Sequence, residues 1–180
     1  MTRDRLAPIA PQELPPLHPS LGAPSLESAT PVFAVRIEVS PDETSALVPH
    51  ANNIVILGWV DLVASLHGAH AGAARDDIAR EGRMWFVARH EVDYLAEAFA
   101  GEPLVLATWV ERAGRTSLIR ATAIVRPDGA AVARARSRWA FVDLGTRRPT
   151  AIPADVLARL TAGGLIDQDS AKKNPVRSEV

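Results

Sequence analysis

Three polar side chains stand directly before a long apolar run in the stretch LVPHANNIVILGW. His50, Asn52 and Asn53 come at the start of residues 53–67, which the apolar pattern predicts as one helix. The first N–H groups of a helix have no partner inside it, so they can stabilise negative charge on a bound oxygen. The cluster therefore has two compatible interpretations. It caps the helix, a role that Asn favours, or it forms a reaction site at the helix head.

Acidic side chains lie on both sides of this cluster. Asp42 and Glu43 precede it, and Asp61 lies on the predicted helix. A carboxylate can activate a water molecule or attack a carbonyl carbon directly. A surface carboxylate in a turn is the alternative interpretation for Glu43, because it follows Pro41.

No motif indicates a metal or a cofactor. His67 and His70 are three residues apart, which is more typical of histidines near the last carbonyls of a helix than of a metal site without a third ligand. HEVDY is not H-E-x-x-H, and the sequence holds neither G-x-S-x-G nor a glycine-rich phosphate loop.

Composition excludes several classes of protein. The 180 residues carry a formal charge of −1 and include no cysteine. Nearly balanced charge argues against nucleic acid or an anionic membrane as the main partner. Without cysteine there are no disulfides and no thiol nucleophile. We find no apolar stretch typical of a membrane span or a signal peptide, and we expect a cytoplasmic location.

The chain divides into three parts. Seven of its 14 prolines fall within residues 1–31, which predicts an extended or disordered arm. Residues 32–162 should form one folded domain, and residues 163–180 a polar tail.

Within the domain the pattern predicts one strand, a buried helix and then four antiparallel strands. The first strand is PVFAVRIEV, and the helix 53–67 should end at Gly68 and Gly72. Residues 73–82 are predicted to form a short helix or a loop. The later strands are MWFVARHEV, PLVLATWVER, TSLIRATAIVR and AAVARARSRWAFVDL, with a hairpin turn at 127–129 and a last helix at 153–160. This order predicts a two-layer α+β fold.

The order and spacing of four segments resemble the hotdog-fold acyl-CoA thioesterases of the 4-hydroxybenzoyl-CoA thioesterase-like superfamily. HANN followed by an apolar run and Trp59 resembles the H-V-N-N…W segment of that family. His67 falls where several members carry a helix histidine. RHEVDYLAEAFAGEPLVLATWV and WAFVDLGTRRPTAIP resemble its H-x-x-D-Y-L…T-W-V stretch and its last strand. The resemblance covers about residues 33–157.

The resemblance implies an antiparallel sheet wrapped around a central buried helix, and a homodimer or homotetramer. It also implies an acyl-CoA or acyl-carrier-protein thioester as the substrate, held beside the helix N-terminus. The amides around residues 51–53 would stabilise the oxyanion, His50 would bond the carbonyl or hold the loop, and Trp59 and His67 would face the acyl group.

The catalytic carboxylate departs from the family pattern. The usual aspartate four residues before the histidine is Ala46 here. Members with a longer loop carry aspartate seven residues before it, which is the position of Glu43. We therefore rank Glu43 first, Asp42 second and Asp61 third.

Three arginines share one face of the last strand. Arg134, Arg136 and Arg138 alternate with Ala133, Ala135, Ser137, Trp139 and Phe141. Together with Arg120 on the neighbouring strand, these arginines could bind CoA phosphates, or they could simply form a solvated sheet face.

Three functions remain open from the sequence. The first is thioester hydrolysis. The second is a non-catalytic hotdog protein that binds an acyl thioester or acts as a structural or regulatory subunit, which the alanine at position 46 favours. The third is a dehydratase or hydratase on the same fold, for which no matching motif is present.

Overall fold

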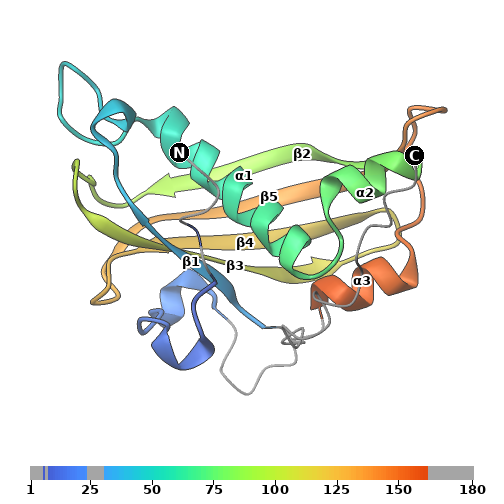
Figure 1. The fold of residues 1–180 in the computed structure, drawn as a ribbon, viewed down its shortest axis with the longest axis horizontal. Coiled ribbons are helices and arrows are strands. Elements are labelled where there is room, and N and C mark those ends of the chain that lie inside the picture. Colours follow the sequence, from blue (N-terminus) through green and yellow to red (C-terminus); the bar gives the residue numbers. More distant parts are fainter. Residues whose placement is uncertain (1–5, 7, 24–30, 162–180) are drawn as a thin grey trace, which may run out of the picture.

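The computed structural model describes residues 6, 8–23 and 31–161. A five-stranded antiparallel sheet curves around one long helix, as Figure 1 shows. The α+β fold with a central helix is confirmed. The predicted tail, residues 163–180, lies outside the described residues.

The elements follow the predicted order. The strands are β1 (Phe33–Glu38), β2 (Arg83–Tyr94), β3 (Pro103–Ala113), β4 (Ser117–Val125) and β5 (Ala131–Asp143), and the helices are α1 (Asn53–His70), α2 (Arg75–Arg80) and α3 (Ala154–Thr161). Short 3-10 helices are η2 (Pro11–Glu13), η3 (Pro19–Leu21) and η4 (Pro41–Glu43). The strand order is β1-β3-β4-β5-β2, so β1 and β2 form the two edges.

Helix α1 continues past the first of the two glycines that were predicted to end it. The helix passes through Gly68 and ends at His70, with Gly72 in the left-handed region at φ +66°. A glycine inside a helix costs only about 1 kcal/mol. Here the chain folds back closely over Gly68, because a Cβ there would lie 3.1 Å from the carbonyl oxygen of Ala73. Of the two glycines predicted to end the helix, Gly68 was therefore wrong, and Gly72, just past the last helical residue, is confirmed.

The main core lies between α1 and the inner face of the sheet. One stripe of α1 is buried, comprising Ile56, Trp59, Val60, Val63, Ala64 and His67. This spacing of three and four residues presents a single helix face to the sheet. The opposite side is open: Ile54 is 74% exposed. No helix within the described ranges is both long enough and apolar enough to cross a membrane.

The outer face of the sheet carries a second core. Ile9 and Leu21, from the proline-rich segment, pack with outward-facing residues of β1, β3 and β4, among them Trp109. The amide of Ile9 also donates a hydrogen bond to the carbonyl of Ala34, at 2.8 Å. The described part of the arm therefore covers the outer face of its own sheet, below β1 and β3 in Figure 1.

Candidate active site at the head of helix α1

Asn52 is the N-cap of α1. Its Oδ1 accepts a hydrogen bond from the amide of Ile54 at 2.9 Å, with extended backbone angles at Asn52 itself. This geometry satisfies one of the free donors of the first turn. The prediction that an asparagine caps this helix is confirmed.

The amides around the helix head differ in their availability. The amide of Ala51 donates to the carbonyl of Ala98 at 2.7 Å, and that of Asn52 donates to the carbonyl of Glu43 at 3.2 Å. The amide of Asn53 has no hydrogen-bond partner among the described residues. Of the three amides expected to hold an oxyanion, two are therefore occupied, and Asn53 supplies the remaining donor.

Glu43 is fixed beside the helix by both carboxylate oxygens. Oε1 accepts a hydrogen bond from Trp59 Nε1 at 3.0 Å, and Oε2 accepts one from the amide of Ser40 at 2.9 Å. The side chain is half-buried, and Trp59 beneath it is 2% exposed. Each carboxylate oxygen can accept more than one hydrogen bond. Glu43 is therefore oriented, and it retains the capacity to accept a proton or a bond from water.

His50 has a carboxylate neighbour that the sequence analysis missed. Its Nδ1 lies 3.4 Å from Oε1 of Glu97, although the geometry does not make a hydrogen bond. A backbone bridge between His50 and Phe99 holds the two loops together. Glu97 lies in the RHEVDYLAEAF stretch, yet nothing in its spacing indicated that it meets His50.

Asp42, next to Glu43, is fully exposed. A hydrogen bond from the Ser40 side chain holds the pKa of Asp42 below its ordinary value. Glu43 is hydrogen-bonded to Trp59 of α1, whereas among the described residues no hydrogen bond joins the side chain of Asp42 to that helix. Its position therefore favours Glu43 over Asp42.

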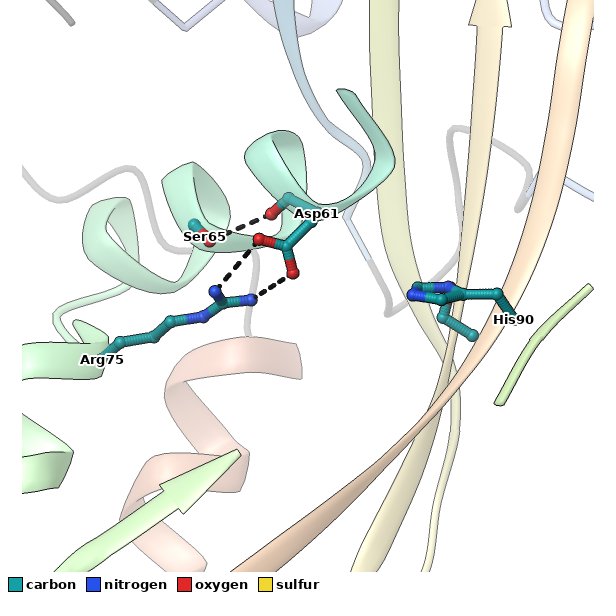
Figure 2. A network of polar contacts seen from close by, with 5 residues as sticks. Asp61, Ser65, Arg75 and His90 are labelled. Atoms are coloured by element: carbon teal, nitrogen blue, oxygen red, sulfur yellow. Dashed lines mark hydrogen bonds and ion pairs between the residues drawn. The ribbon is translucent and has the colours of Figure 1, made fainter. Parts of the chain in front are cut away.

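Asp61 belongs to a separate group further along the helix. It lies eight residues after Asn53, about 12 Å along the axis. Both of its carboxylate oxygens accept hydrogen bonds from Arg75, at 2.8 and 3.1 Å, as Figure 2 shows. His90 lies across from this pair in the same view. Burial lowers the pKa of His90, while the charge of Asp61 acts in the opposite direction.

His67 lies at the far end of α1, buried against the sheet. Its Nδ1 is 2.6 Å from Nη1 of Arg120, and its ring stacks on Phe33 at 5.3 Å. Burial, followed by the charge of Arg120, lowers the pKa of His67 to about 3. His67 is therefore neutral at ordinary pH, and its Nδ1 accepts the hydrogen bond from Arg120.

Arg120 does not join the arginines of β5. It pairs with Ser137 in the β4–β5 register, and paired residues share a face of the sheet. Ser137 faces the helix, and Arg120 is accordingly 5% exposed. Placing Arg120 in the basic stripe was therefore wrong.

The three outward arginines of β5 are exposed, and two of them already have acidic partners. Arg134 pairs with Asp93 at 2.6 Å, and Arg136 makes a bidentate pair with Glu111 at 2.8 and 2.5 Å. Arg138 has no ion pair within the described part of the chain. All three lie on the face opposite α1, away from Glu43 and His50.

Large apolar side chains are exposed around the helix head and along β2. We call this set the apolar rim; it comprises Leu47, Val48, Ile54, Phe86, Val87, Tyr94, Leu95 and Phe99. The hydroxyl of Tyr94 also lies 3.4 Å from the carbonyl of Asn53. The rim therefore continues from the candidate site onto an edge strand.

The chain was compared with sequence profiles of protein families, with curated proteins and with solved structures. Residues 45–160 match the sequence profile of a family described as the thioesterase-like superfamily. A comparison with curated proteins found no match.

Solved structures share the fold at low identity. A 1,4-dihydroxy-2-naphthoyl-CoA thioesterase from Synechocystis is 14% identical with a TM-score of 0.67, over 72% of this chain and 96% of its own. A thioesterase from Thermus thermophilus, complexed with coenzyme A and Zn, is 24% identical with a TM-score of 0.61, over 71% of this chain and 90% of its own.

A longer protein also matches. A protein provisionally assigned as an oleoyl thioesterase from Lactobacillus plantarum is 17% identical with a TM-score of 0.69, over 73% of this chain. The match spans about half of that protein, 51% of its length. At these identities the structures establish the hotdog fold.

Proposed function

The chain belongs to the thioesterase-like superfamily, and on that premise we propose that it hydrolyses an acyl-CoA or acyl-carrier-protein thioester to a free acid and a thiol. The observation that carries the proposal is the pairing of a free helix-head amide at Asn53 with a carboxylate, Glu43, held on the same helix through Trp59. Thioester hydrolysis needs both a donor for the oxyanion and a group that activates water.

The geometry suggests a division of roles. The thioester carbonyl oxygen would lie on the Asn53 amide, where the positive end of the helix dipole favours developing negative charge. Glu43 would take a proton from water, whose oxygen bonds to the carbonyl carbon. The carbon–sulfur bond then breaks, and the proton passes to the departing thiolate. His50, beside Glu97, would donate a second hydrogen bond to the carbonyl or hold the loop.

A second copy of the chain would complete the site. Strand β2 is a long edge strand, and Phe86 and Val87 on it are exposed. Long apolar edges tend to pair with another strand. We propose a homodimer that pairs these edges and covers the apolar rim. A tetramer is compatible with the sequence, although the arm occupies part of the outer face.

CoA phosphates would require cations, and the outward arginines of β5, which lie on the face opposite α1, could supply them only to a thioester held by a neighbouring copy. Arg134 and Arg136 are engaged by Asp93 and Glu111, so each would have to exchange a partner. Arg138 is the arginine of this face best suited to receive a phosphate, because no described carboxylate neutralises it.

A non-catalytic binder is the second candidate. Both oxygens of Glu43 already accept hydrogen bonds, one in a capping arrangement with Ser40. A carboxylate used in this way can be purely structural. Such a protein would bind acyl thioesters through the same helix head without turning them over.

Substituting Glu43→Gln tests the proposal. Glutamine keeps the size and can still accept a hydrogen bond from Trp59, but it is a far weaker base. We expect kcat for thiol release to fall at least about a hundredfold, the usual contribution of a general base. Asp42→Asn is the matched control, because it removes the neighbouring exposed carboxylate and should leave kcat nearly unchanged.

The thermal midpoints of both variants should be measured alongside. If folded Glu43→Gln retains wild-type kcat, Glu43 is not the catalytic carboxylate. If Asp42→Asn loses activity instead, the catalytic role moves to the neighbouring carboxylate.

A further inference from the structure

A cavity lies away from the helix head. It is a small space between the C-terminal half of α1 and strands β2, β4 and β5, and it opens to solvent at its mouth. Its polar lining comes from Ser65, Arg75, Arg120 and Trp139, and its apolar lining includes Leu118 and Trp85. Arg120 and Trp139 are nearly fully buried, whereas Arg75 and Trp85 are partly exposed. The buried pair therefore forms the inner wall and the exposed pair the mouth.

Arg120 carries a buried positive charge without a counter-ion. No carboxylate within the described ranges lies within ion-pair distance of it, and its one side-chain hydrogen bond joins it to neutral His67. Taking a charge out of water costs several kcal/mol unless an opposite charge compensates it. The fold therefore buries the Arg120 guanidinium at an energetic cost, in a place where an anionic ligand could neutralise its charge.

Trp139 adds an unused donor to the same cavity. Its side chain is 4% exposed, and its Nε1 has no hydrogen-bond partner among the described residues. Buried indole N–H groups normally find an acceptor. One buried donor without an acceptor and one buried cation without a counter-ion therefore line the same small space.

Arg75 covers this space without adding net charge. Its guanidinium lies 5.0 Å from the centre of the Trp139 ring, and it is neutralised by the bidentate pair with Asp61 shown in Figure 2. The hydroxyl of Ser65 donates to the carbonyl of Asp61, which keeps the hydroxyl beside the same pair. The local balance is one uncompensated positive charge.

We propose that this cavity binds the carboxylate of a small organic acid or of an acyl chain. Arg120 pairs with the carboxylate, and Trp139 Nε1 donates a further hydrogen bond to it. A single guanidinium matches a monoanion, and the planar fork suits a carboxylate. The hydrocarbon next to it would run towards the mouth and contact Leu118 and Trp85, which line the same space.

The carboxylate could come from two sources. One is a free carboxylic acid, which would enter from the mouth beside Arg75. The other is the far end of a substrate's acyl chain, and this source rests on the proposed function. His67, which Arg120 contacts, lies 14 residues after Asn53, about 21 Å along α1. A chain that spans this separation within one copy must be long.

Calorimetric titration with hexanoate tests the first source without any turnover. Hexanamide is the uncharged probe of equal length. Because a hydrogen-bonded charge pair is worth at least about 1.5 kcal/mol, hexanoate should bind at least about tenfold more tightly than hexanamide. Arg120→Met should abolish this preference. Arg138→Met, the same change on the outer face of β5, should leave it intact.

Trp139→Phe supplies a second variant that preserves ring packing and removes the Nε1 donor. It should weaken hexanoate binding about tenfold while leaving hexanamide binding nearly unchanged. This variant keeps the proposal testable even if Arg120→Met fails to fold.

The second source is tested by comparing hexadecanedioyl-CoA with palmitoyl-CoA. A higher kcat/KM for the dicarboxylic substrate that Arg120→Met removes assigns the carboxylate to the acyl chain. Equal binding of hexanoate and hexanamide, together with equal kcat/KM for the two thioesters, overturns the proposal. Absence of turnover on both thioesters counts against the proposed function alone, because the hexanoate titration then decides about the cavity.

Discussion

His67 is a buried histidine whose ionisation opposes folding. Its pKa is lowered from 6.5 to about 3, chiefly by burial and then by the charge of Arg120. Between these two values the unfolded chain binds a proton at His67 and the native protein does not. Stability must therefore fall as the pH falls from about 6.5 towards 3, because protons favour the unfolded state in that range.

Substituting His67→Gln should flatten this pH dependence. Glutamine retains a carbonyl acceptor for Arg120 but cannot be protonated, so the free energy of unfolding should fall less between neutral pH and about pH 4. Urea denaturation at several pH values measures the slope. His18→Gln, which changes an exposed histidine of the arm, is the control and should retain the wild-type slope. Equal slopes in wild type and His67→Gln would mean that His67 does not resist protonation.

The sequence predicted which residues lie at the site better than it predicted which side chains they contact. An asparagine N-cap was predictable because the cap preference is a local property of the chain, and the structure then selected Asn52 over Asn53. The contacts of His50 with Glu97 and of Asp61 with Arg75 join residues distant in sequence, and no local pattern encodes them. The amide of Asn53 emerged as the available donor only once loop contacts occupied those of Ala51 and Asn52.

At the scale of elements, the head of α1 determines the site. The Asn52 side chain fixes the first turn, and the first turn determines where the Asn53 amide points. Loss of the cap therefore affects both stability and the candidate oxyanion donor.

Asn52→Ala should lower the free energy of unfolding by about 1 kcal/mol and also lower kcat/KM for thioesters. Asn52→Asp retains an acceptor and should restore most of both. Asn53→Ala is the matched control for stability, since it keeps the backbone amide and removes a side chain that is exposed. Chemical denaturation and thiol-release kinetics measure the two effects. A loss of stability in Asn53→Ala equal to that in Asn52→Ala would refute the capping role.

Strand alternation was predictable, whereas register was not. The alternation of β5 correctly separated the buried face of Ala135 and Trp139 from the exposed arginines. Arg120 was misplaced because its face depends on which residue of β5 it pairs with, and a shift of one residue reverses that face. The end of α1 was local: Gly72 takes the left-handed conformation, and the amide of Ala73 donates to the carbonyl of Gly68 at 2.8 Å.

At the scale of the whole molecule, α1 packs on one face of the sheet, the arm packs on part of the other face, and the edge at β2 stays open. The described arm residues pack Ile9 and Leu21 on the outer face, next to Trp109. The proline count predicted an arm but gave no indication of where it lies, because its few apolar residues carry no periodicity. The edge at β2 remains unpaired in a single chain and exposes Phe86.

Phe86→Lys should shift the protein from dimer to monomer, because a charge at the paired edge must be desolvated for the dimer to form. Light scattering coupled to size-exclusion chromatography measures the molar mass. Phe86→Leu keeps an apolar side chain and should remain dimeric. A wild-type protein that is monomeric at all accessible concentrations, or a dimeric Phe86→Lys, would exclude this edge as the interface.

Thioester hydrolysis is the central claim, and thiol release from short, long, branched and aromatic acyl-CoAs tests it most directly. The sequence contains no cysteine, so the folded protein adds no thiol background to the assay. The proposed site predicts catalysed release from at least one acyl class, with kcat depending on Glu43. Absence of release across the panel, and from acyl-carrier-protein thioesters, by a folded protein that still binds acyl-CoA would contradict it and establish the non-catalytic binder.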